Sequence, residues 1–189
     1  MDIYTKICVF LNAETMEEMN NNALAIANYF IDKSNPNTDK YPLTLLRLVK
    51  YVYIAYGFAL VILKKKIIDE RFDKVEAWKY GPVIPSVYHT FKHHRNNPIS
   101  EKASIPVFES RDGELLFREP KIEDKEIIIL LDFVWDRYQD KSITELIDLL
   151  HRPGTPWEYC YRKGENVEIH DKMTEIYYNS IVENALRKA

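Results

Sequence analysis

The feature that most constrains this sequence is a run of thirteen residues without a charged side chain, from Tyr51 to Leu63. Apolar residues recur at three- and four-residue steps through this run and just ahead of it, as in a helix with a buried face. A helix that spans a membrane needs ~20 apolar residues, and Lys50 and Lys64–Lys66 flank this shorter run directly. The pattern therefore predicts a central core helix, opened by Pro42, and no membrane span.

The length and composition predict one globular domain. A chain of 189 residues with 46% hydrophobic residues can bury a sizeable core, and we expect a leader at residues 1–20 and a single domain at residues 21–189. The net charge of −3 gives no global field that would attract nucleic acid. Cys8 and Cys160 are isolated and the apolar run Ile7–Leu11 is too short for a signal peptide, so we expect a cytoplasmic protein.

The rest of the chain has mainly helical patterns. Apolar spacing and capping residues predict further helices near residues 23–33, 85–95, 123–139 and 142–150, and from residues 155 and 170 onward. Two short apolar runs, 105–108 and 114–117, flank Arg111-Asp112-Gly113, a typical turn signal, and predict a hairpin with Pro106 at an edge. The fold class is therefore mainly α, a single compact domain of six or seven helices with a minor β-hairpin.

The stretch Glu76–Tyr88 predicts a sharp bend. Gly81 and Pro82 favour a turn, and Pro85 suits the first position of the helix that follows. The aromatic residues Trp78, Tyr80 and Tyr88 either anchor this bend in the core or form an exposed recognition surface. We favour the core, because large aromatic side chains are highly buried on average.

The sequence offers little that is typical of an enzyme. It has no phosphate-binding glycine loop, no dinucleotide fingerprint and no nucleophile elbow. His89 and His93 share a helix face, as metal ligands can, but Lys92 and Arg95 beside them would repel a cation, so we expect no metal. We interpret Lys64–Lys66 as charges that complement the end of the central helix.

Four stretches of the sequence, in the same order, resemble the Panacea domain of the SocA-like antitoxins, a family first catalogued as phage-associated proteins. Leu46–Tyr53 is similar to the family's first motif, with Arg47 in place of a lysine and Tyr51 in place of a leucine. Glu76–Val83, followed by Pro85 and Val87-Tyr88, matches the most recognisable motif almost letter for letter.

The third stretch is Leu146–His151 followed by Thr155-Pro156-Trp157, with Leu150 in place of a threonine. The fourth, Ile169–Tyr178, resembles the family's closing helix, so the resemblance spans about residues 24–178. It implies a non-enzymatic bacterial or phage-borne antitoxin, without a cofactor, that neutralises a toxin by direct binding. Similar domains pair with toxins of unrelated fold, and one characterised type also delivers its toxin to an ATP-dependent protease.

The resemblance marks residues that would shape the fold or bind the toxin. They are Lys50, Tyr53, Glu76, Trp78, Tyr80, Gly81, Pro82, Val83, Pro85, Tyr88, His151, Pro156 and Trp157. The leader and the segment 96–122 lie outside the shared motifs, which makes Arg111, Asp112 and Gly113 candidates for partner-specific contacts.

Two other function classes stay open at this point. The first is a regulator that binds nucleic acid through Lys64–Lys66 and Lys92–Arg95. The second is a metal-dependent hydrolase built on His89 and His93.

Overall fold

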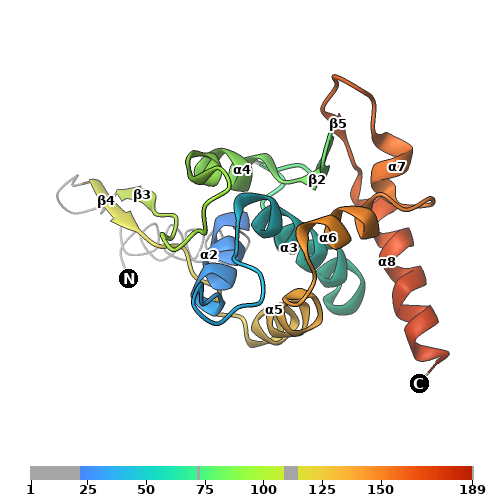
Figure 1. Ribbon diagram of the computed structural model, residues 1–189, viewed down its shortest axis with the longest axis horizontal. Helices are drawn as coiled ribbons and strands as arrows, with labels where there is room; N and C mark the ends of the chain where they lie inside the picture. Colours follow the sequence, from blue (N-terminus) through green and yellow to red (C-terminus); the bar gives the residue numbers. More distant parts are fainter. Residues whose placement is uncertain (1–21, 72, 109–114, 189) are drawn as a thin grey trace, which may run out of the picture.

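A long buried helix lies at the centre of the domain (Figure 1). The computed structural model describes residues 22–71, 73–108 and 115–188, and in it α3 (Leu45–Phe58) continues into the π-helical turn η1 (Ala59–Leu63). Every residue of α3 except Leu46 is buried. By length and composition Leu45–Leu63 could cross a membrane, but 89% of its most apolar window is buried inside the domain, as in the core helix of a soluble protein.

The start of the central helix differs from the expected one. Pro42 does not open it, because Thr44 still has an extended backbone, with φ −92° and ψ 168°, and occupies the N-cap position of α3. The carbonyl of Leu43 accepts a hydrogen bond of 2.9 Å from the N–H of Ile99. This contact with a distant loop keeps the chain extended until Leu45.

Five helices pack against α3: α2 (Ala23–Lys33), α4 (Pro85–Phe91), α5 (Lys125–Tyr138), α6 (Ile143–Leu150) and α8 (Asp171–Leu186). The short α7 (Pro156–Cys160) packs on α8, and the 3-10 turn η2 (Lys92–His94) extends α4. The described part of the chain thus contains seven α-helices, which confirms the mainly α class. In Figure 1 the helices surround α3, and α8 runs along one side towards the C-terminus.

Local capping signals place several helix starts. Ser142 and Glu145 form the expected reciprocal capping box at α6, and α8 begins directly after His170. At α7 only half of a box forms: the Thr155 side chain accepts from the Glu158 N–H, whereas the Glu158 carboxylate accepts from Gly154 at 3.4 Å.

Two small antiparallel sheets complete the fold. The predicted hairpin is present as β3 (Ile105–Phe108) and β4 (Leu115–Arg118), with Ile105 opposite Arg118. Its turn, with Arg111, Asp112 and Gly113, lies outside the described residues, as do residues 1–20 of the expected leader. The second sheet was not predicted: β1 (Glu76–Trp78) pairs with β2 (Gly81–Val83) on one side and β5 (Val167–Glu168) on the other.

A close fit between α3 and α8 anchors the last helix. Tyr178 of α8 is buried, and its ring packs edge-on against Tyr53 and Phe58 at 6.1 and 4.9 Å between ring centres. Gly57 leaves room for that ring, because a β-carbon at this position would lie 2.3 Å from Tyr178 Cε2. Gly57 therefore forms the notch on α3 that receives the Tyr178 ring.

Candidate functional site

The motif residues meet around the buried amine of Lys50. This side chain is completely buried, and its Nζ donates a hydrogen bond of 2.9 Å to the carbonyl oxygen of Pro82. Burial lowers the pKa of Lys50 to about 7, because the charged ammonium loses its hydration inside the protein. The amine thus joins the middle of α3 to strand β2 of the β1–β2 hairpin.

Gly81 allows this close approach. Its φ of 104° is one that residues with a side chain rarely adopt. A β-carbon there would lie 3.0 Å from Lys50 Nζ and 3.3 Å from His151 Nε2. The amine and the imidazole therefore approach the same point next to the backbone of the hairpin.

His151 ends α6 and brings its ring into this cluster. Its backbone N–H closes the helix on the carbonyl of Ile147, as expected for a residue at this end. Burial, followed by the positive charge of Lys50, lowers the pKa of His151, and Asp148 opposes this effect. Its Nε2 is buried and has no hydrogen-bond partner among the described residues.

A stack of rings covers the cluster on the side of α7. The Trp157 ring lies flat on His151, with ring centres 3.5 Å apart and an interplanar angle of 3°. Its other neighbour is Tyr161, at 4.7 Å and 17°. The indole N–H of Trp157 donates to the carbonyl of Trp78 at 2.7 Å, which fastens α7 to strand β1.

The Trp78 ring continues this contact towards α4. Its indole N–H donates to the Glu76 carboxylate at 2.6 Å, and its ring packs edge-on against Tyr88 at 4.8 Å. The arrangement connects α3, the hairpin, α4, α6 and α7 through polar and aromatic contacts. The residues brought together are Lys50, Glu76, Trp78, Gly81, Pro82, Tyr88, His151 and Trp157; we call them the motif cluster.

The comparison with known families covers this same cluster. The sequence model described as "Antitoxin SocA-like, Panacea domain" matches residues 48–158, more than half of the chain and every member of the motif cluster. The chain belongs to the SocA-like Panacea family.

A curated relative supports this assignment. This chain is 28% identical over 144 residues to a protein of Caulobacter vibrioides named "Antitoxin SocA". The alignment covers 76% of this chain and 72% of that relative. No solved structure gives a significant match.

Five motif residues of the Panacea domain lie outside the cluster. Tyr53 points to Tyr178 in α8, Val83 is part of the core, Pro85 occupies the first turn of α4, and Pro156 is buried at the start of α7. Each has a local structural role. The fifth, Tyr80, differs from all of these because its side chain is 50% exposed.

The predicted core position of the bend aromatics is therefore only partly right. Trp78 and Tyr88 are partly buried and pack against the core, but the core assignment is wrong for Tyr80. Tyr80 occupies the tight turn between β1 and β2, where a side chain points away from the domain. The sequence reasoning also missed Tyr161, although its i,i+4 spacing from Trp157 is typical of a stacked pair next to a helix.

The basic and histidine-rich segments take separate roles. Lys65 pairs with Asp124 and Glu126, and Lys66 with Glu70 and Asp171, so these two charges of the Lys64–Lys66 run stabilise the fold. Lys64 has a left-handed backbone and ends η1.

His89 and His93 do not form a common site. The His89 ring lies 6.1 Å from that of Trp78, whereas His93 lies near His94 and Glu101, whose ligand atoms fall within 4.8 Å of one another.

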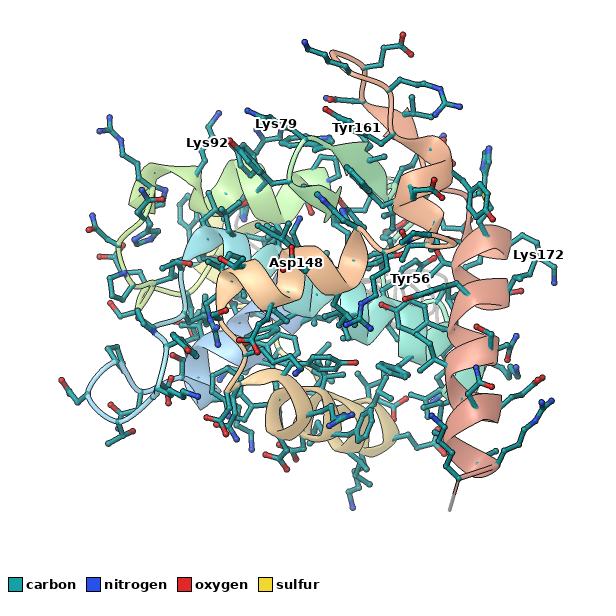
Figure 2. All side chains as sticks on the ribbon, turned by 45° about the vertical axis from the view of Figure 1, so that its right-hand side comes forward. Tyr56, Lys79, Lys92, Asp148, Tyr161 and Lys172 are labelled. Carbon is teal, nitrogen blue, oxygen red and sulfur yellow. The ribbon has the colours of Figure 1, made fainter. Side chains whose placement is uncertain are left out.

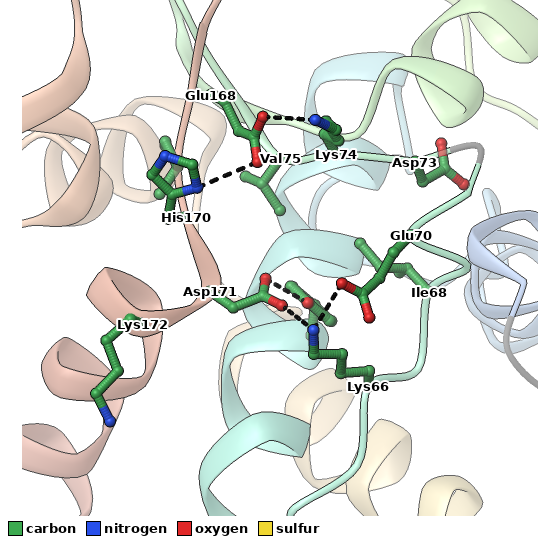
Figure 3. Close-up of a pocket in the computed structure, with 12 residues that line it drawn as sticks. Lys66, Ile68, Glu70, Asp73, Lys74, Val75, Glu168, His170, Asp171 and Lys172 are labelled. Carbon is green, nitrogen blue, oxygen red and sulfur yellow. Dashed lines mark hydrogen bonds and ion pairs between the residues drawn. The ribbon is translucent and has the colours of Figure 1, made fainter.

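A polar pocket of about 370 Å³ lies apart from the motif cluster, between Tyr56 of α3, the segment before β1 and the start of α8 (Figure 3). Its charges are largely paired: Lys66 bridges Glu70 and Asp171, and Lys74 pairs with Glu168 at 2.9 Å. The Tyr56 hydroxyl also donates to Asp171 at 2.5 Å. These contacts hold α8 and β5 against the central helix.

Proposed function

We propose that this protein is a cytoplasmic antitoxin that neutralises a cognate toxin by direct protein–protein binding and without catalysis. The observation that carries the proposal is the Panacea domain at residues 48–158, which is named for antitoxins. The relative named Antitoxin SocA supports the same function class.

The geometry of the motif cluster supports a binding role over an enzymatic one. Lys50 has no exposed surface, and both faces of the Trp157 ring are covered by His151 and Tyr161. A catalytic base or nucleophile must come within hydrogen-bond reach of a substrate, which an enclosed amine cannot do without opening the fold. The buried amine of Lys50 therefore holds the β1–β2 hairpin in place, and the surface around the hairpin is available for a partner.

Co-expression tests this proposal. Each reading frame that adjoins the gene is expressed from an inducible promoter in a bacterial host, alone and together with the tagged protein. One adjoining product should arrest growth when it is expressed alone, and the full-length protein should restore growth and co-purify with it. The control is the same gene with an early stop codon, which should give no rescue.

Two results would overturn the proposal. One is that no adjoining product arrests growth, and the other is that growth recovers although no complex forms. An immunoblot of the toxin separates two modes of action: unchanged toxin means masking, whereas toxin that disappears only in a host with ATP-dependent proteases means delivery for degradation.

A further inference from the structure

Positive charge gathers on one surface of the domain. The segment from Ala77 to Ser100 contains no Asp or Glu, but it contains Lys79, Lys92, Arg95 and three histidines, in a chain whose net charge is −3. Each of these three cations is exposed, and none has a carboxylate partner among the described residues. We call Lys79, Tyr80, His89, Lys92 and Arg95 the hairpin surface.

The contacts of the hairpin and α4 bring Lys79, Tyr80 and His89 together, and the backbone N–H of Arg95 donates to the carbonyl of Lys92 at the end of η2. Lys79 Nζ lies 4.9 Å from the centre of the Tyr80 ring at the tip of the hairpin. Trp78, directly before them, contacts the His89 ring on α4, and Lys92 follows His89 by three residues. Figure 2 shows Lys79, Lys92 and Tyr161 along one edge of the molecule, above Asp148.

The hairpin surface is preformed. The two strands of the hairpin are fixed from inside by the Lys50 to Pro82 hydrogen bond and from the side by the Trp157 to Trp78 hydrogen bond. A partner that docks here meets a rigid turn, so little conformational entropy is lost on binding. Tyr80, with half of its side chain exposed, offers the large amphipathic ring that is enriched at binding hot spots.

We infer that the hairpin surface is the docking site for the toxin and that the toxin contributes an acidic segment there; this inference rests on the proposed antitoxin function. Charge complementarity favours an acidic partner, because approaching carboxylates would offset the repulsion between these neighbouring positive charges.

A protein fits this surface better than a nucleic acid does. Nucleic acid is bound through a track of many cations and through free aromatic faces. The hairpin surface carries three full positive charges, and the Trp78 and Trp157 rings are engaged with Tyr88, His151 and Tyr161.

Charge reversal tests the inference. The variant Lys79→Glu with Lys92→Glu is compared with Lys40→Glu with Lys121→Glu, which changes the net charge equally at exposed lysines elsewhere. A third variant, Tyr80→Ser, removes the exposed ring. Growth rescue and affinity are measured with the growth-arresting product of the adjoining reading frame, and thermal unfolding is recorded for each free protein.

We expect Lys79→Glu with Lys92→Glu to bind the toxin at least ~10-fold more weakly and to lose rescue, with unchanged melting. Tyr80→Ser should also weaken binding, and the control pair should behave like the parent. Affinity of the parent should fall as NaCl rises from about 50 to 500 mM, because exposed ion pairs are screened.

Other outcomes overturn the docking site and leave the proposed function intact. The first such outcome is that Lys79→Glu with Lys92→Glu rescues growth as well as the parent does. The second is that rescue is lost only in a variant in which the charges of Arg111 and Asp112 are reversed. Sequence-selective binding of a labelled upstream DNA fragment that requires Lys92 would assign the surface to nucleic acid instead. If the parent itself does not bind or neutralise the adjoining product, the proposed function fails, and the inference fails with it.

Discussion

The amine of Lys50 and the imidazole of His151 converge on Gly81, within 3.0 and 3.3 Å of the point where a β-carbon would lie. The two groups come from helices α3 and α6, one hundred and one residues apart in the sequence. Two ionisable groups whose pKa values are lowered by burial thus meet at the one glycine of the hairpin, and this contact determines the first two predictions.

Gly81→Ala should destabilise the protein strongly. The new methyl group would crowd Lys50 and His151 and would also strain a backbone with φ 104°, so we expect a loss of ~2–4 kcal/mol in the free energy of unfolding. The control is Gly154→Ala, where φ is 85° but no atom lies within 4 Å of the added carbon, and strain alone costs ~1 kcal/mol. Urea denaturation measures both, and equal losses would refute the crowding.

Lys50→Met should remove a pH dependence of stability. The folded protein holds the pKa of Lys50 at about 7, and the unfolded chain restores it to ~10.4, so between these values the unfolded state binds more protons. The stability of the parent should therefore rise from pH 7 to 9.5, by at most ~1.4 kcal/mol per pH unit, and level off near the unfolded pKa.

The measurement is chemical denaturation from pH 6 to 9.5 for parent and variant. The difference in unfolding free energy, parent minus Lys50→Met, should grow steadily across this range, because methionine fills the space and does not titrate. A constant difference would mean that Lys50 keeps its ordinary pKa in the folded protein.

Trp157 and Trp78 should act mainly through packing. Replacing a large ring that joins two elements with alanine costs ~3–5 kcal/mol when it is fully buried, and these partly buried rings should approach the lower value. Trp157→Phe should cost less, ~1–2 kcal/mol, chiefly through the lost hydrogen bond to the Trp78 carbonyl.

Thermal unfolding compares these variants with Tyr80→Ala. Because Tyr80 is half exposed, its removal should leave the melting temperature almost unchanged, whereas Trp78→Ala and Trp157→Ala should melt several degrees lower. Parent-like melting of Trp78→Ala together with lost neutralisation would show that this ring belongs to the recognition surface.

Gly57→Ala should loosen the attachment of α8. Its β-carbon would overlap the Tyr178 ring at 2.3 Å, and that ring is enclosed on its other sides by Tyr53 and Phe58. We expect a loss of ~1–3 kcal/mol and faster amide exchange that is greatest in α8. Adding Tyr178→Leu should recover part of the loss, and no recovery would indicate that the clash lies elsewhere.

The fold class followed from signals that are local in sequence. The uncharged run in α3, the capping box at Ser142 and Glu145, and Pro85 at the start of α4 each involve residues within a few turns of one another. Such patterns depend directly on the local backbone conformation. The Pro42 start was wrong because a distant partner, Ile99, keeps the chain ahead of α3 extended.

The motif cluster could not be assembled from the sequence. The resemblance named its members, but the contact of Lys50 with Pro82 spans 32 residues and that of Trp157 with Trp78 spans 79. The pairing of Glu76 with Glu168 joins strands separated by an even longer stretch, with no periodic pattern in the two-residue β5. The exposure of Tyr80 likewise depends on the tight turn that its neighbours form.

The notch at Gly57 shows that the unit that folds extends beyond the segment that the family model matches. The family match ends at residue 158, yet Tyr178, which fills the notch, and β5, which pairs with β1, lie beyond it. A fragment cut at the family boundary would leave a hole in the side of α3 and an open edge on β1. Exchanges of Panacea domains between proteins should therefore carry the last helix along with the matched segment.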